Sequence, residues 1–176
     1  REPRVVPDPD GLVYRHFLTG NSRLGLYTNP STRAQLKSEA IWEIEGSLDL
    51  KASDLYAAST DRSAWYQALQ RTFTQFDYIA VPTAQVFPFD VTQHWPKQIA
   101  DRQMDTYHRW MEVVVAWTLS GCPVISVPVG FNADGLPMGM QLIGRPRDDL
   151  GVLQLAAAYE KVRDWVNDRL PPAIEG

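Results

Sequence analysis

The sequence lacks three features that would place it in common classes of protein. It has one cysteine, Cys122, so no internal disulfide can form and a reducing cytoplasm is the expected compartment. It has no basic excess, because the formal net charge is -4, and this argues against a nucleic-acid or anionic-membrane partner. It also lacks an apolar run of about 18 residues, so no membrane span is predicted.

The composition is that of a folded protein. Apolar residues make up 44% of the 176 residues and aromatic residues 11%, enough for one domain with a real core. Residues 1–11 contain no apolar stretch of the kind found in signal peptides, and they resemble a loop entered in mid-course. His16, His94 and His108 do not have the spacing of a metal site, so neither a metal nor another cofactor is expected.

The chain divides into three segments by pattern. Residues 1–31 are rich in proline, glycine, asparagine and aspartate and are predicted to be an irregular lead-in. Residues 32–76 are predicted to be helical, with one short helix ended by Gly46 and a longer one whose apolar stripe is interrupted by Arg62. Residues 77–170 combine strands and helices.

The third segment predicts a sheet with helical cover. Strands are expected at 77–82, 123–130 and 138–144, the last two as a hairpin. Helices are expected at 104–119, where Gly121 ends the helix, and after Asp148 and Asp149, which suit a helix N-terminus. Because the strands are apolar on both faces and three strands make a poor sheet, we predict an α/β fold. Its sheet should be part of a mixed β-sheet flanked by helices and incomplete on its own.

One long stretch is specific enough to suggest a family. Residues 121–145 read GCPVISVPVGFNADGLPMGMQLIGR and resemble the C-terminal hallmark of amidase signature enzymes. The spacing that carries the resemblance is that of Gly121, Pro123, Pro128, Gly130, Gly135, Pro137, Gly139, Gln141 and Gly144. The strand FDYIAVPT over residues 76–83 and the last helix agree with it, so the resemblance covers roughly residues 35–165.

The resemblance implies that residues 1–176 are the C-terminal portion of a single amidase domain. The family hydrolyses a carboxamide to a carboxylate and ammonia or an amine, with a serine nucleophile, a bridging serine in a cis peptide and a lysine base. This sequence has no Ser-Ser pair and no consecutive glycines, which the nucleophile motif contains, and none of its lysines stands beside such a loop. The resemblance therefore places no catalytic residue in this chain. The remainder of the amidase chain becomes the expected partner, and a homo-oligomer stays possible.

Two segments are candidates for a wall of the amide-binding pocket. In the family, the loop after the 76–83 strand borders the acyl pocket, which points to Gln85, Val86 and Phe87. Glutamine-directed relatives have an acidic residue about ten positions before the first glycine of the hallmark, and that offset falls on Met111 here. Met111 and its neighbour Trp110 therefore favour an aliphatic or aryl amide over glutamine. The structural alternative is that these aromatic and apolar residues are ordinary packing.

Two other functions stay open from the sequence. A non-catalytic folding or interaction module would require a closed, well-covered core within these residues. A separate small hydrolase would need Ser126 as nucleophile and a base within hydrogen-bond reach of its hydroxyl. Ser126 lacks a Gly-x-Ser-x-Gly elbow, and as a strand residue it would only make a local hydrogen bond.

Overall fold

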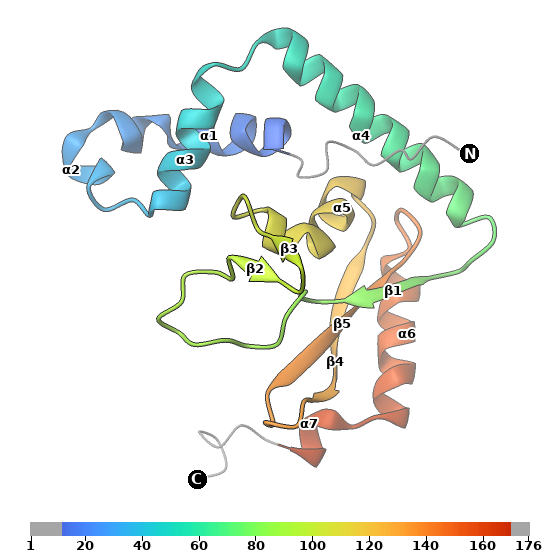
Figure 1. The fold of residues 1–176 in the computed structure, drawn as a ribbon. Helices are drawn as coiled ribbons and strands as arrows, with labels where there is room; N and C mark the ends of the chain where they lie inside the picture. The colour runs from blue at the N-terminus through green and yellow to red at the C-terminus, as the bar shows by residue number, and fades with distance from the viewer. Residues whose placement is uncertain (1–11, 170–176) are drawn as a thin grey trace.

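The computed structural model describes residues 12–169, and the predictions for residues 1–11 and 170 lie outside that range. Four helices form the N-terminal half: α1 Leu12–Thr28, α2 Pro30–Arg33, α3 Ser38–Leu48 and α4 Ala52–Thr72. The second half contains β1 Ile79–Pro82, β2 Gln98–Ile99, β3 Arg102–Gln103, the 3-10 helix η1 Arg109–Met111, α5 Glu112–Ser120, β4 Val124–Phe131, β5 Pro137–Ile143, α6 Asp149–Val162 and α7 Trp165–Asp168. Figure 1 shows α1–α4 gathered above the sheet and α6 beside it.

The expectation of an irregular lead-in over residues 1–31 is wrong for residues 12–28, which form α1. This stretch contains Gly20 and Gly25, which weaken a helix in isolation, but packing against a neighbouring helix overrides that weakness. Gly20 is buried, and a Cβ there would lie 1.8 Å from the Ser47 hydroxyl oxygen of α3. The two helices therefore cross at a distance that only glycine permits.

Gly46 does not end α3, which continues to Leu48. The sequence prediction was wrong here because this glycine permits close packing and does not end a helix. A Cβ on Gly46 would lie 2.5 Å from the ring of His16, which packs over α3 at this position. Gly46 is thus required for a close approach between helices.

Alanine substitutions at Gly46 and at Gly25 should change the free energy of unfolding in opposite directions. Gly46→Ala should lower the free energy of unfolding by about 1–3 kcal/mol, because the added methyl group overpacks the His16 ring. Gly25→Ala is the matched control within α1, where no atom of the described residues lies within 4 Å of an added Cβ. It should stabilise the protein by up to about 1 kcal/mol. Urea titration measures both, and equal changes in the two variants would contradict the close approach.

The three-stranded sheet has the order β1-β5-β4, with antiparallel pairing throughout. The predicted hairpin of residues 123–144 is confirmed. The mixed character expected of the sheet does not appear in residues 12–169, where both this sheet and the small β2-β3 pair are antiparallel. Within the same residues, β1 and β4 each pair along one edge only.

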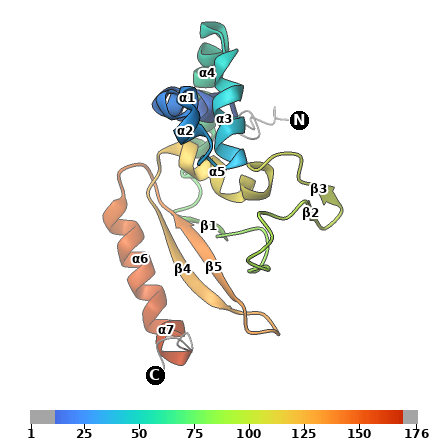
Figure 2. The same ribbon diagram turned by 90° about the vertical axis from the view of Figure 1, so that its left-hand side faces the viewer.

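Helices cover the two faces of the sheet. On one face, Ile143 packs with Leu69 of α4, with Phe73 at the C-cap of that helix and with Cys122. On the other face, Leu142 and Val127 pack against α6 through Ala156. Figure 2 shows α6 lying along the hairpin. Side chains that alternate along β5 therefore enter two separate cores, as the pleat of a strand requires.

Polar contacts explain the exceptions in the helix patterns. Arg62, which interrupts the apolar stripe of α4, donates from Nε to the carbonyl of Leu119 at 2.8 Å. The indole of Trp65 donates to the carbonyl of Ala116 at 2.8 Å. Asp148 accepts a hydrogen bond from the Gly151 amide at 3.1 Å, so it is the predicted N-cap of α6. Gly121 ends α5 in the left-handed conformation at φ 67, also as predicted.

The helix predicted over residues 104–119 begins later than expected. Residues 109–111 form η1, and α5 starts at Glu112. The reason is that the Met104 amide donates to the carbonyl of Lys97 at 2.9 Å, which continues the β2-β3 pair and keeps this stretch out of a helix. Met104 and Tyr107, whose spacing predicted a helix, therefore lie in an irregular segment that precedes η1.

Candidate functional site

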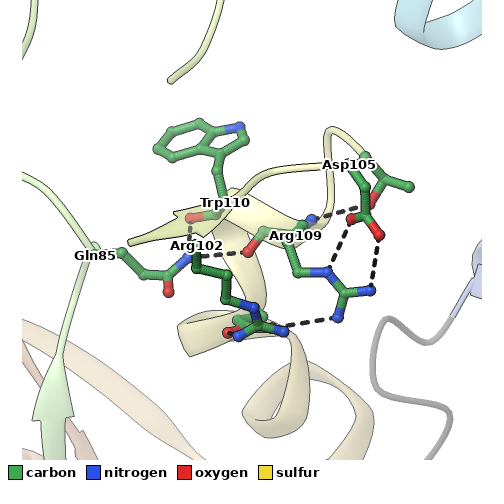
Figure 3. A network of polar contacts seen from close by, with 7 residues as sticks. Gln85, Arg102, Asp105, Arg109 and Trp110 are labelled. Atoms are coloured by element: carbon green, nitrogen blue, oxygen red, sulfur yellow. Dashed lines mark hydrogen bonds and ion pairs between the residues drawn. The ribbon is translucent and has the colours of Figure 1, made fainter. Parts of the chain in front are cut away.

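The 3-10 helix η1 carries two of the predicted wall residues, Trp110 and Met111, and Gln85 holds it in place. The side-chain Nε2 of Gln85 donates to the carbonyl of Arg109 at 2.9 Å and to that of Trp110 at 2.5 Å. Figure 3 shows Gln85 reaching these carbonyls from the segment that follows β1. The structure therefore brings Gln85, Trp110 and Met111 together, although they are distant in the sequence.

Charged side chains fix η1 from the opposite side (Figure 3). Arg109 donates from Nε to a carboxylate oxygen of Asp105 at 2.9 Å and lies 3.5 Å from the carboxylate of Glu112. Glu112 also pairs with Arg102. The hydrogen bond from Arg109 holds the pKa of the Asp105 carboxyl below its ordinary value. These contacts define the orientation of η1 at its start and at its junction with α5.

The 83–95 loop meets η1 through an aromatic contact that sequence reasoning missed. The ring of Phe89 packs edge-on against Trp110, with 5.8 Å between ring centres. Phe87, the predicted contact, is 38% exposed, and Val86 and Met111 are half-buried. The indole Nε1 of Trp110 is buried and has no hydrogen-bond partner among the described residues. A buried donor of this kind is uncommon in folded proteins, where most are paired.

A second polar cluster lies behind η1 and connects it to the N-terminal helices. The carboxylate of Glu43, in α3, pairs with Nε2 of His108 and lies 3.1 Å from Nδ1 of His16. All three side chains are buried. Burial by itself raises the pKa of Glu43, but the hydrogen bonds from His108 and His16 outweigh it and lower this pKa from 4.5 to about 2. His108 is therefore a hydrogen-bonded core residue.

Two pockets adjoin this cluster. One of about 670 Å³ lies between α3 and the 91–94 segment and is lined by Arg23, Lys37, Glu39, Ala40, Glu43, Val91, Gln93, His94 and Tyr107. The other, of about 250 Å³, includes Trp42, Trp95 and Lys97. His94 lies 3.5 Å from Glu39 at the first pocket. In the part of the chain that the structure describes, no group of three histidine, cysteine or acidic residues is arranged to hold a metal ion.

Ser126 has a hydroxyl neighbour and not a base. Its Oγ lies 2.9 Å from Oγ1 of Thr83, across the sheet from β4 to the end of β1. A threonine hydroxyl does not act as a general base at neutral pH. Gly139 lies between them, where a Cβ would stand 2.7 Å from the Thr83 hydroxyl. This contact is the local hydrogen bond of a strand residue, and it gives no support to a Ser126 hydrolase.

Gln141, at the end of the hallmark stretch, has a structural role in this chain. Its side chain is buried, and Nε2 donates to the carbonyl of Pro82 at 2.9 Å and to that of Val113 at 3.5 Å. A single amide group thus connects β5 to β1 and α5. Gly144, the residue after β5, leaves room for Val152 of α6, because a Cβ there would lie 2.3 Å from that side chain.

Comparison with known proteins shows the family. The family model described as Amidase matches residues 14–153, and the chain belongs to the amidase signature family. It is 36% identical over 162 residues to a fatty acid amide hydrolase of Medicago truncatula, covering 90% of this chain and 26% of that protein. It is 32% identical over 166 residues to a fatty acid amide hydrolase of Arabidopsis thaliana, covering 90% of this chain and 26% of that protein.

A solved structure agrees with the sequence matches. A bacterial aryl acylamidase of the amidase signature family superposes with a TM-score of 0.72 at 26% identity, over 86% of this chain and 32% of that chain. The chain therefore spans about a third or less of the length of these relatives. Among the described residues, no helix is both long enough and apolar enough to cross a membrane.

Proposed function

We propose that these residues are the C-terminal part of an amide hydrolase, which converts a carboxamide to a carboxylate and ammonia or an amine. The observation that carries the proposal is the family match over residues 14–153, which extends over only 26–32% of the relatives described above. The Ser–cis-Ser–Lys triad of the family would then lie in polypeptide outside these residues. The cytoplasm is the proposed compartment, and a buried free thiol at Cys122 is compatible with it.

This chain would contribute strands and a wall of the substrate pocket. In the described residues, β1 and β4 each pair only with β5. Their other edges could pair with further strands of a larger sheet. Gln85, Val86, Phe87, Trp110 and Met111 are the proposed wall. Since Gln85 uses its N–H groups on η1, its carbonyl oxygen is the atom that would meet a substrate.

The wall favours an aryl or aliphatic amide over glutamine. Met111 stands where the resemblance places the acidic residue of glutamine-directed relatives, and a thioether cannot bind an ammonium group through charge. Trp110 and Phe89 add aromatic surface at the same place. The names of the relatives do not separate the two classes, because they include fatty acid amide hydrolases, an aryl acylamidase and glutamyl-tRNA(Gln) amidotransferase subunits A, so the preference rests on Met111 and Trp110.

The test compares the complete amidase polypeptide with residues 1–176 on 4-nitroacetanilide, hexanamide and glutamine. We expect turnover of the first two amides by the complete polypeptide only, with kcat/KM for glutamine at least about a hundredfold lower, the loss typical of a missing charged contact. Ser126→Ala in the complete polypeptide is the control and should keep kcat/KM within about twofold. Amide turnover by residues 1–176 that Ser126→Ala abolishes would overturn the proposal.

A further inference from the structure

The carboxylate of Glu43 joins two segments that are far apart in the chain. His16 lies 27 residues before it and His108 lies 65 residues after it. The exposed fractions are 8% for Glu43, 9% for His16 and 3% for His108. The Nδ1 atom of His16 also lies 3.1 Å from the Glu43 carbonyl oxygen, so the ring is held to α3 through backbone and side chain together. Buried charge is costly unless it is paired. Here Oε1 pairs with His108, whereas Oε2 lies 3.1 Å from Nδ1 of His16 and accepts no hydrogen bond among the described residues.

The surroundings are shaped around this bridge. The indole of Trp42 packs against both histidine rings, with centre-to-centre distances of 4.8 Å to His16 and 5.9 Å to His108. Tyr107 packs edge-on against His108 at 5.9 Å. Gly46 supplies the space that the His16 ring occupies. The two histidine rings that contact the carboxylate are thus packed against Trp42 and, for His108, also against Tyr107.

His108 is the residue immediately before η1. Its carbonyl accepts the Met111 amide at 3.0 Å, which closes the single turn of η1. A 3-10 turn of three residues has little stability of its own, so its placement depends on contacts from outside. Gln85 supplies them from the sheet side, as described above, and Glu43 supplies them from the helical side.

We propose that Glu43 is a positioning residue, which sets the place of η1 through His108 and thereby places Trp110 and Met111 in the pocket wall. The part of the inference that concerns the pocket rests on the proposed function. Glu43 does not touch substrate in this account. It acts through His108, which connects α3 to the start of η1 and so to Trp110 and Met111.

The experiment uses the complete polypeptide and four variants, the last of which, His108→Gln, tests rescue. Glu43→Gln removes the charge at nearly constant shape. His108→Phe keeps a ring between Trp42 and Tyr107 and removes the N–H donor. Glu45→Gln is the matched control, because Glu45 lies two positions along the same helix, is half-exposed, and pairs with Arg33 at 3.2 Å away from η1. Amide hydrogen exchange of residues 104–111 is measured without substrate, and KM and kcat are measured with 4-nitroacetanilide.

Glu43→Gln and His108→Phe should both speed exchange in residues 104–111 by a factor at least about tenfold larger than the factor in β4 and β5, whose exchange reports the change in global stability. KM should rise by about five- to twentyfold with kcat within about twofold, since a displaced wall weakens binding of substrate and transition state alike. His108→Gln, which restores an amide N–H donor, should recover most of both effects. Glu45→Gln should match the wild type in exchange and kinetics.

Wild-type exchange and KM in both Glu43→Gln and His108→Phe would overturn the positioning role. Failure of both variants to fold would overturn it as well, since Glu43 would then support the whole helical layer and not η1 in particular. The two proposals fail separately. If the wild type hydrolyses no amide, the proposed function is wrong, and the exchange measured without substrate still decides whether Glu43 places η1.

Discussion

Lowering the pH from about 5 to about 2 should remove about 3 kcal/mol from the free energy of unfolding through Glu43. The folded-state pKa of this carboxyl is about 2, below its ordinary value of 4.5, because hydrogen bonds from His108 and His16 outweigh the effect of burial. A group with a lowered folded-state pKa contributes its stability above the unfolded-state pKa. That contribution is therefore complete above 4.5 and is lost as the pH falls through about 2.

Urea titrations at several pH values measure this acid-dependent loss. Glu43→Gln should be less stable than the wild type at neutral pH and should show a flatter dependence on pH below about 5, because it has no proton to take up at this position. Glu45→Gln removes a half-exposed carboxylate from the same helix and should retain most of the acid-dependent loss. Parallel pH curves for the wild type and Glu43→Gln would show that the buried pair contributes nothing.

Ile143→Ala should be the most damaging single truncation in the sheet, at about 2–5 kcal/mol. Ile143 is fully buried and packs with Leu69, Phe73 and Cys122, so its removal leaves a cavity between the sheet and α4. Val124 is the matched control, because it pairs with Ile143 in the β4-β5 register and is 39% exposed. Val124→Ala should cost less than about 1 kcal/mol in residues 1–176.

The same two variants also test whether the sheet is incomplete. If further polypeptide covers β4 in the complete amidase, Val124→Ala should cost at least about 1 kcal/mol more there than in residues 1–176, because its side chain would then be buried. Ile143→Ala should cost about the same in both, because its contacts lie within these residues. Chemical denaturation measures all four differences. Equal costs for Val124→Ala in the short and complete polypeptides would argue against added cover at this strand.

The elements that local sequence determines were predictable. The β4-β5 hairpin was found because two apolar strands flank turn residues, and Gly121 and Asp148 were recognised from the chemistry of helix ends. The α1 helix was missed because it depends on contact with α3, and a glycine-containing stretch predicts no helix by itself. The late start of α5 also depends on a tertiary contact. The Met104 amide donates to the carbonyl of Lys97, and the helical spacing of apolar residues does not indicate this bond.

The membership of the candidate site stays a prediction, and its arrangement was not indicated by the sequence. Gln85, Trp110 and Met111 were chosen through the family resemblance, and the structure joins Gln85 to η1 by hydrogen bonds that no sequence spacing indicates. The Glu43 cluster was not predicted at all. Its members are separated by 27 and 65 residues, and a glutamate within a helix ordinarily suggests a solvated face. Contacts between distant segments, and not local pattern, therefore determine most of this site.

The position of β5 bears on how the chain folds as it emerges from the ribosome. Among the three strands of this sheet in residues 12–169, β5 is synthesised last, but it lies between the two earlier ones, so Ile79 can pair only after residue 143 has been made. Until then β1 and β4 have no neighbour within these residues, so two apolar strands stay open to chaperones and to other nascent chains. A stop codon between residues 132 and 137 would release a polypeptide that contains β1 and β4 but lacks the strand that joins them.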